Sequence, residues 1–180
     1  IKTALCFELK DQMGLENIKL REEEMLDLAF EGLDKIPGLK ILADNIRKRL
    51  GVISFYVEEI HYNLIVRILN DKYGIQTRGG CACAGTYGHF LLEVSYDKSQ
   101  EITNKINDGD LSDKPGWVRW SLHPTMTNTE INLMISALND IVKNIEIYKK
   151  DYTHDKRTNV YWHKNEKSDT ALLNSWFLLE

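Results

Sequence analysis

The sequence has few cysteines and no long apolar run, and these two shortages restrict the kinds of protein that it can encode. Its 180 residues include three cysteines, Cys6, Cys81 and Cys83. An odd and low number argues against a secreted, disulfide-stapled scaffold and favours a reducing compartment, so we expect a cytoplasmic protein. No apolar run approaches the roughly 18 residues of a membrane span, and no signal peptide is visible. We therefore expect no membrane partner.

The chain also lacks an excess of basic residues. Its formal net charge is -4 at pH 7, whereas a nucleic-acid-binding surface needs clustered basic side chains. The stretch Arg47-Lys48-Arg49 is basic but short, and we interpret it as solvated surface. We expect no nucleic-acid partner. Hydrophobic residues form 43% of the chain, which is enough for the packed core of one ordinary domain.

The chain begins at Ile1, without a methionine and inside a helical pattern. Such a start suggests a fragment of a longer protein. The helical pattern runs from Thr3 to Ile36 with a predicted break near Gly14, and Pro37-Gly38 ends it.

Periodicity and turn residues predict the elements that follow. We expect strands at 39–43 and 51–58, a helix at 62–73 that ends at Gly74, a short strand at 75–78, a helix at 86–94, a surface loop at 98–115, a strand at 117–122 and a helix behind a capping box at 127–130. The fold class is α/β of the α+β type, with a small, mostly antiparallel sheet of about four strands packed with helices. We assign residues 1–149 to this domain and residues 150–180 to a C-terminal appendage of unknown role.

The stretch QTRGGCACAG, residues 76–85, places two thiols in a glycine-rich loop. A structural zinc site needs about four ligands, and only His89 and Cys6 could join the pair, so we predict no metal site. A Cys81–Cys83 disulfide would be strained, because a single residue separates the two thiols.

Two interpretations of this loop remain open. In the first, the glycines permit a positive φ and the cysteines are small buried fillers. In the second, one thiol is a nucleophile. It lies where a loop enters a helix, near backbone N–H groups, and Arg78 stands just before it; both features favour the thiolate. Cys83 is nearer to the following helix than Cys81.

Arg119 lies inside the apolar and aromatic strand pattern WVRWSL, residues 117–122. An arginine in such a strand must either reach solvent or meet an anion. A guanidinium can bind a carboxylate through two parallel hydrogen bonds. Arg119 is therefore a candidate carboxylate-binding residue, with an outward-facing strand position as the alternative.

GIQTRGGCACA and GWVRWSLHPTMTNTEI, taken together, resemble the C-terminal small domain of class V aminotransferases, the group that includes cysteine desulfurases and selenocysteine lyases. The resemblance covers roughly Thr3 to Ile145. In desulfurases an arginine precedes the catalytic cysteine by five positions and an alanine follows it, a spacing that Arg78 and Cys83-Ala84 match. The family's Arg-x-Ser-Leu strand and threonine-capped helix match residues 119–122 and 127–130.

The resemblance implies the small domain of a fold-type I enzyme that uses pyridoxal phosphate and acts on an amino acid. It implies that Cys83 is the catalytic, sulfur-accepting nucleophile, that Arg119 binds the substrate's α-carboxylate, and that Arg78 supports the substrate or the loop. It also implies a homodimeric parent. The family's Schiff-base lysine motif does not occur in this sequence, so we assign no cofactor-binding residue here. We expect a large domain of the same chain to bind the cofactor, and this chain to be inactive alone.

The resemblance leaves the reaction open. Desulfurase or selenocysteine lyase chemistry is the first expectation. In the commonest desulfurase loop, however, bulkier residues stand where this chain has Gly79, Gly80 and Cys81. Transaminase chemistry, with Cys83 as a bystander, is therefore the second expectation. A separate module whose Cys-x-Cys loop binds a metal or a partner protein is the third.

Overall fold

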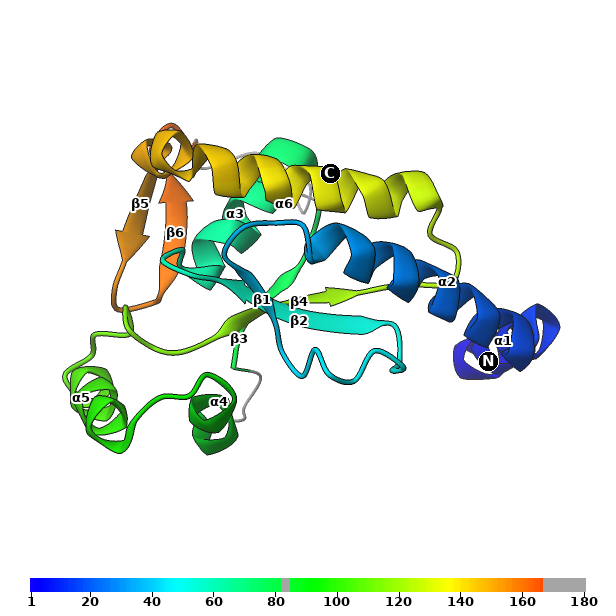
Figure 1. The fold of residues 1–180 in the computed structure, drawn as a ribbon, viewed down its shortest axis with the longest axis horizontal. Helices are drawn as coiled ribbons and strands as arrows, with labels where there is room; N and C mark the ends of the chain where they lie inside the picture. Colours follow the sequence, from blue (N-terminus) through cyan, green and yellow to red (C-terminus); the bar gives the residue numbers. More distant parts are fainter. Residues whose placement is uncertain (82–84, 167–180) are drawn as a thin grey trace, which may run out of the picture.

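A four-stranded sheet organises the chain, as the computed structural model of residues 1–81 and 85–166 shows (Figure 1). The strand order is β1-β2-β4-β3, and all three pairings are antiparallel. The strands are β1 (Leu39–Ile41), β2 (Val52–Val57), β4 (Trp117–Ser121) and β3 (Arg78–Gly80). The predicted fold class, a small antiparallel sheet of about four strands packed with helices, is confirmed.

The two central strands have one face in the core and one face away from it. Successive side chains of a strand point to opposite faces. Ile53 and Phe55 of β2 and Val118 of β4 are fully buried. Ser54 lies between the first two and pairs with Arg119. The alternation therefore directs Arg119 to the face of the sheet that is turned away from the main core.

Three helices cover the core face of the sheet: α2 (Leu15–Leu33), α3 (Tyr62–Tyr73) and α6 (Asn128–Tyr148). They lie on the same side of the strands in Figure 1. Each contributes fully or nearly fully buried apolar side chains to one cluster with β2 and β4, including Met25, Ala29, Leu33, Ile65, Ile68, Leu69, Ile131, Met134, Leu138 and Ile141.

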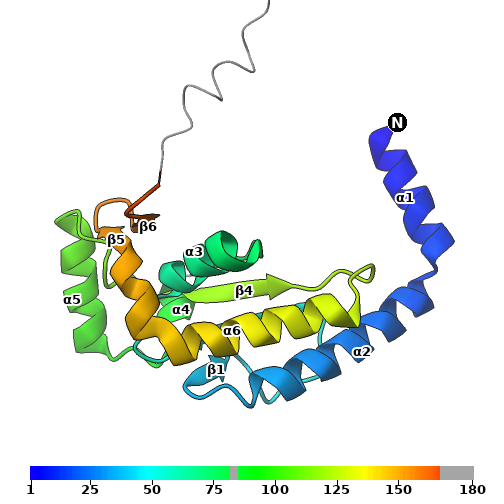
Figure 2. The same ribbon diagram turned by 90° about the horizontal axis from the view of Figure 1, so that it is seen from above.

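The N-terminal helical pattern forms two helices, as predicted. Helix α1 (Lys2–Met13) and α2 are separated at Gly14, whose φ of 79° lies in the region that favours glycine. No residue of α1 is buried. Figure 2 shows α1 turned away from the remaining elements, so α1 does not contribute to the core.

Two predicted helix ends are confirmed. The side chain of Thr127 accepts a hydrogen bond from the Glu130 N–H at 3.2 Å, and the Thr127 N–H donates to the Glu130 carboxylate at 2.7 Å. This reciprocal capping box starts α6. The second is the C-terminal end of α3, where Gly74 has a left-handed φ of 66°.

The prediction of a surface loop over 98–115 is wrong for its first half, which forms α5 (Tyr96–Asn107). The Ser95 hydroxyl caps this helix by accepting a hydrogen bond from the Lys98 N–H at 3.3 Å. Ile102 is the only buried residue of α5. Ile102 and Ile106 are the only apolar residues in the stretch 98–107, so its polar composition favoured a loop although the two isoleucines have helical spacing.

The short strand expected at 75–78 begins later, at Arg78, and includes the two glycines of β3. Strand pairing uses backbone groups, so Gly79 and Gly80 can pair with β4 although glycine is uncommon in strands. The helix expected at 86–94 is α4 (Gly85–Leu91).

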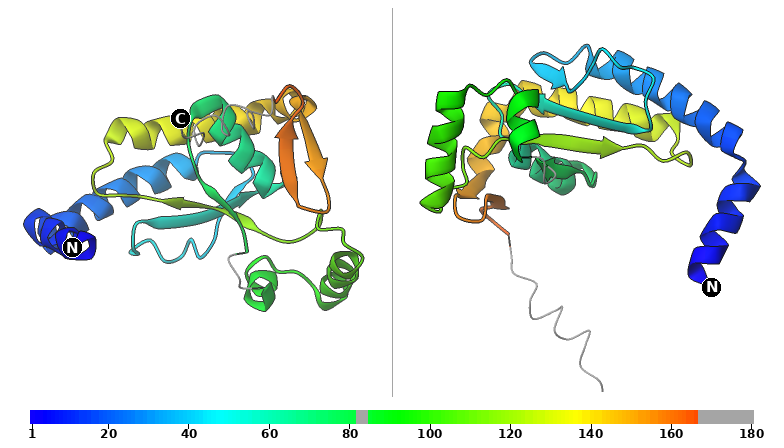
Figure 3. Two further views of the ribbon diagram at one scale, coloured as in Figure 1. Left: turned by 180° about the vertical axis from the view of Figure 1, so that it is seen from behind. Right: turned by 90° about the horizontal axis from the view of Figure 1, so that it is seen from below.

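A β-hairpin follows α6 and the short 3-10 helix η1 (Lys149–Asp151). It consists of β5 (Tyr152–Asp155) and β6 (Val160–His163). The view from behind in Figure 3 shows this hairpin beside α3, and Tyr152 belongs to the main core cluster. The predicted division between residues 149 and 150 stays a prediction. No helix in the described part of the chain is long and apolar enough to cross a membrane.

Candidate functional site

Arg78 and Arg119 stand directly opposite each other on neighbouring strands. They are Cα partners in the antiparallel pairing of β3 with β4. Directly opposite residues of an antiparallel pair project from the same face. Two arginines that are 41 positions apart in the printed sequence therefore lie side by side on the face away from the core.

Both arginines line a pocket of about 300 Å³, together with Cys81. The structure thus brings together the two predicted substrate-binding arginines and the first thiol of the glycine loop. Cys83, the predicted nucleophile, lies outside the described residues. The remaining residues that line the pocket are Tyr62, Asn63, Gly79, Gly80, Leu111, Lys114, Trp117, Thr158 and Asn159.

The pocket is basic. Arg78, Lys114 and Arg119 line it, and none of its described lining residues is acidic. Within residues 1–81 and 85–166, none of these three cations forms a salt bridge. The Nε atom of Arg119 is buried and has no hydrogen-bond partner there. Because an unpaired buried charge is unfavourable, this arrangement suits an anionic ligand.

Two glycines make room for an aromatic wall of the pocket. A Cβ atom at Gly116 would lie 2.6 Å from the Cε1 and Cζ atoms of the Tyr62 ring. A Cβ atom at Gly79 would lie 2.5 Å from Asn63 Oδ1 and 3.0 Å from Tyr62 Cδ2. Real Cβ atoms essentially never lie closer than 3.0 Å to such neighbours, so these glycines permit α3 to approach the sheet closely at the pocket.

Sequence reasoning missed Tyr62, Lys114 and Asn159 as pocket residues. Asn159 Nδ2 donates a hydrogen bond to the Tyr62 hydroxyl at 2.9 Å. These two residues are distant in sequence, and only the hairpin's position brings them together. The structure gives Asn159 a positive φ of 59°, a backbone conformation in which asparagine is enriched, but an asparagine in a polar stretch does not by itself mark a pocket residue.

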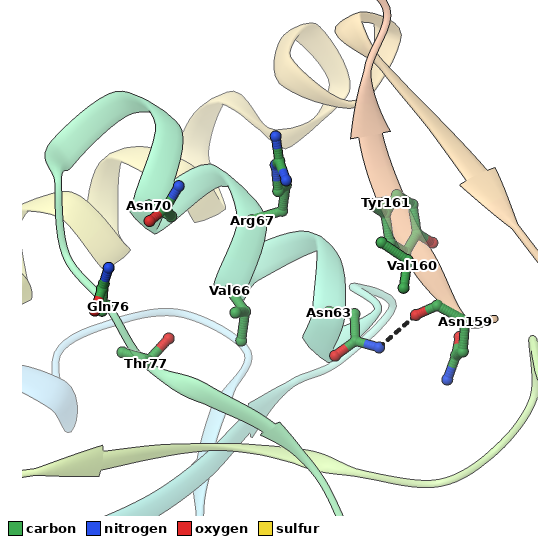
Figure 4. Close-up of a pocket in the computed structure, with 9 residues that line it drawn as sticks. All are labelled: Asn63, Val66, Arg67, Asn70, Gln76, Thr77, Asn159, Val160 and Tyr161. Carbon is green, nitrogen blue, oxygen red and sulfur yellow. Dashed lines mark hydrogen bonds between the residues drawn. The ribbon is translucent and has the colours of Figure 1, made fainter. Parts of the chain in front are cut away.

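A second, larger pocket adjoins the basic pocket and has a volume of about 450 Å³ (Figure 4). Asn63 and Asn159 line both pockets, so the contact between these residues forms a shared wall. Neutral polar side chains prevail in the second pocket, which is lined by Asn63, Val66, Arg67, Asn70, Gln76, Thr77, Asn159, Val160 and Tyr161.

A cluster of aromatic rings joins α3 to the hairpin beside this wall. His61 stacks on Tyr62 with ring centroids 4.4 Å apart, and His154 stacks on Tyr161 at 4.3 Å. Burial, with a smaller contribution from His154, lowers the pKa of His61 to about 4. The neutral His61 ring can then accept a hydrogen bond at Nδ1 from the Asn63 N–H, at 3.1 Å.

The cysteines in the described residues do not form a metal cluster. Cys6 is exposed on α1 and does not line the basic pocket, and Cys81 is partly exposed. No group of three or more His, Cys, Asp or Glu side chains that could hold a metal ion occurs in residues 1–81 and 85–166.

The family model "Aminotransferase class-V" matches residues 1–134. The match covers well over half of the chain, and the chain belongs to the class V aminotransferase family. The resemblance inferred from the two sequence motifs is therefore confirmed.

Relatives within the family are described as cysteine desulfurases. The chain is 28% identical over 102 residues to "Probable cysteine desulfurase 2" of Mycobacterium leprae, an alignment that covers 56% of this chain and 24% of that relative. It is 39% identical over 72 residues to the cysteine desulfurase of Serratia proteamaculans, covering 40% of this chain and 17% of that relative. The chain thus spans about a quarter or less of the length of these relatives.

A solved structure supports the fold. The apo structure of a cysteine desulfurase from Thermococcus onnurineus matches with a TM-score of 0.52 and 24% sequence identity. The match covers 74% of this chain and 28% of that structure. The sheet with its covering helices therefore corresponds to one part of a desulfurase fold.

Proposed function

We propose that the full-length protein is a pyridoxal-phosphate-dependent enzyme of the cysteine desulfurase or selenocysteine lyase type, which removes sulfur from L-cysteine and leaves alanine. Family membership and the desulfurase relatives support this proposal. The observation that carries it is the buried Nε of Arg119, which has no partner among the described residues. It lies in a basic pocket with Arg78 and Cys81.

The residues of this pocket fit the substrate end of such an enzyme. Pyridoxal phosphate, when bound, supplies an electron sink for bonds at the amino acid's Cα. The Arg119 guanidinium, whose Nε has no partner among the described residues, fits the α-carboxylate of the amino acid, because it can donate two parallel hydrogen bonds. Since the chain spans about a quarter of its relatives, we propose that a large domain of the same chain holds the cofactor, and that residues 1–180 alone are inactive.

Each predicted site residue has one task in this proposal. Arg119 binds the carboxylate, and Arg78 adds a second positive charge beside it. The Cys83 thiolate attacks the substrate sulfur. As the new sulfur–sulfur bond forms, the carbon–sulfur bond breaks, its electron pair stays with carbon, and carbon takes a proton to give alanine. A persulfide remains on Cys83. The parent acts as a homodimer, as the family resemblance implies.

Transaminase chemistry is the second candidate. The observation in its favour is that the arginine pair of the pocket suits any α-amino acid, whether or not a thiol takes part. In this case Arg119 keeps its role and Cys83 is a bystander. The two candidates differ in their products and are therefore separable by one assay.

The test is product analysis. The full-length protein, loaded with pyridoxal phosphate, is given L-cysteine, and alanine and sulfide are quantified in the presence of a thiol reductant. We expect alanine and sulfide in equal amounts. Amino-group transfer from L-cysteine to an added keto acid, with no sulfide, would instead select the transaminase.

Replacing Arg119 with glutamine is expected to raise KM for the amino-acid substrate by about 10- to 100-fold, because a hydrogen bond to a charged group contributes roughly 1.5–3 kcal/mol. The change in kcat should be much smaller. Arg47→Gln is the control, since Arg47 pairs with Asp34 at the surface and does not line the pocket. If neither substitution changed KM, Arg119 would not be the residue that binds the substrate carboxylate.

A further inference from the structure

The turn between β5 and β6 reaches the basic pocket, although the family model matches only residues 1–134. Asn63 Nδ2, at the start of α3, donates a hydrogen bond to the Asn159 carbonyl oxygen at 2.6 Å (Figure 4). On the side of the loop after α5, the Leu111 N–H donates to the Lys156 carbonyl oxygen at 2.8 Å. Two elements of the family domain thus hold the hairpin turn at the pocket.

The side chain of Asn159 is held in one orientation. Asn159 is 6% exposed and is the only buried polar residue in the described part of the chain. Its Nδ2 donates to the Tyr62 hydroxyl at 2.9 Å, and its Oδ1 lies 2.9 Å from His154 Nε2. The Asn159 Oδ1 accepts from His154 when the ring proton is on Nε2. With this histidine tautomer, Asn159 is the donor in its contact with Tyr62, and the Tyr62 oxygen is the acceptor.

The Tyr62 hydroxyl keeps its own proton for another partner. A phenol can accept one hydrogen bond and still donate another. No residue that the structure describes accepts from Tyr62. Its ring is fixed against Gly79 and Gly116, and it lines the pocket that contains Arg78 and Arg119. Burial raises the pKa of Tyr62, which keeps the hydroxyl protonated and able to donate.

We propose that Tyr62 donates a hydrogen bond to the substrate carboxylate that Arg119 binds, and that Asn159 of the C-terminal hairpin is the positioning residue for this hydroxyl. The hairpin is then part of the amino-acid site. This inference rests on the proposed carboxylate site, but it does not depend on the choice between desulfurase and transaminase, since both bind an α-carboxylate.

The test measures amino-acid binding rather than turnover. L-Alanine, which has no sulfur to transfer, is titrated into the full-length holoenzyme, and its Kd is taken from the change in cofactor absorbance. We expect Tyr62→Phe to raise this Kd about 10-fold, as for a lost hydrogen bond to a charged group. Tyr161→Phe removes the same atom from a residue that lines the second pocket but not the basic pocket, and it should leave Kd unchanged.

A double-substitution experiment tests the role of Asn159. Asn159→Asp keeps the side chain's shape but presents an acceptor to the Tyr62 hydroxyl, which would then turn its proton away from the ligand. We expect Asn159→Asp to raise the Kd for L-alanine at least as much as Tyr62→Phe does. In the Tyr62→Phe background, Asn159→Asp should have less than half of that effect, because the residue acts through the hydroxyl.

The outcomes separate this inference from the proposed function. If Arg119→Gln weakens L-alanine binding but Tyr62→Phe does not, the carboxylate site stands and the role of Tyr62 is overturned. If neither substitution changes Kd, both the site and the inference fail. Fully additive effects of Tyr62→Phe and Asn159→Asp would overturn the positioning role of Asn159. The melting temperature of each variant, which should match wild type within a few degrees, identifies effects that come from unfolding.

Discussion

Replacing Cys83 with alanine in the full-length holoenzyme is expected to abolish the release of sulfide and alanine from L-cysteine, with a loss of at least about 10³-fold in kcat, as for removal of an enzyme's nucleophile. The physical reason is that no other atom in the proposed reaction takes up the sulfur. The measurement is the initial rate of alanine formation at saturating L-cysteine.

Substitutions of the other two cysteines are the controls, and we expect both to lower kcat far less than Cys83→Ala. Cys81 lines the basic pocket but has the wrong spacing from Arg78 for the desulfurase pattern, so Cys81→Ala should lower kcat by less than about 10-fold. Cys6 is exposed on α1, and Cys6→Ala should have no effect. If Cys83→Ala kept wild-type activity, the desulfurase mechanism would be wrong, and the glycine loop would have a structural role only.

Phe55→Ala is expected to have the largest effect on stability among single core truncations in the sheet. The Phe55 side chain is fully buried. Its strand pairs on both sides, with Ile41 of β1 and Val118 of β4 as its cross-strand partners. Truncating a buried phenylalanine costs about 3–5 kcal/mol, because the lost burial is added to the cavity that remains. Urea unfolding followed by tryptophan fluorescence measures this change.

Phe90→Ala is the matched control for this prediction. Phe90 is 75% exposed on α4, so the same chemical change removes little buried surface. Surface substitutions of this kind usually change the free energy of unfolding by less than about 0.5 kcal/mol. Equal effects of the two substitutions would mean that the sheet around Phe55 does not form the stable core of the chain.

The elements with strong apolar patterns could be predicted from the sequence, and those without such patterns could not. The stripe behind the capping box at Thr127 and the stop at Gly74 gave α6 and α3 correctly. Helix α5 was missed because Ile102 and Ile106 are the only apolar residues in the stretch 98–107. Its Ser95 cap was visible in the sequence, but a serine before a polar segment is also typical of loops.

The site was predictable only where family motifs marked it. Arg78 and Arg119 were found from their motifs, but their direct pairing depends on the register of two strands that are far apart in sequence. The Tyr62–Asn159 contact joins residues 97 positions apart. Neither residue belongs to a catalytic pattern, and contacts between distant segments leave no periodic signal that sequence reasoning can use.

The strand order β1-β2-β4-β3 has a consequence for association between copies of the chain. It leaves β1 and β3 as the edges of the sheet, where unpaired backbone groups could add a strand from another molecule. Both edges have only three residues, and each carries an exposed cation, Lys40 in β1 and Arg78 in β3. Short strands and edge charges oppose such aggregation. Arg78 therefore limits the growth of the sheet as well as charging the pocket.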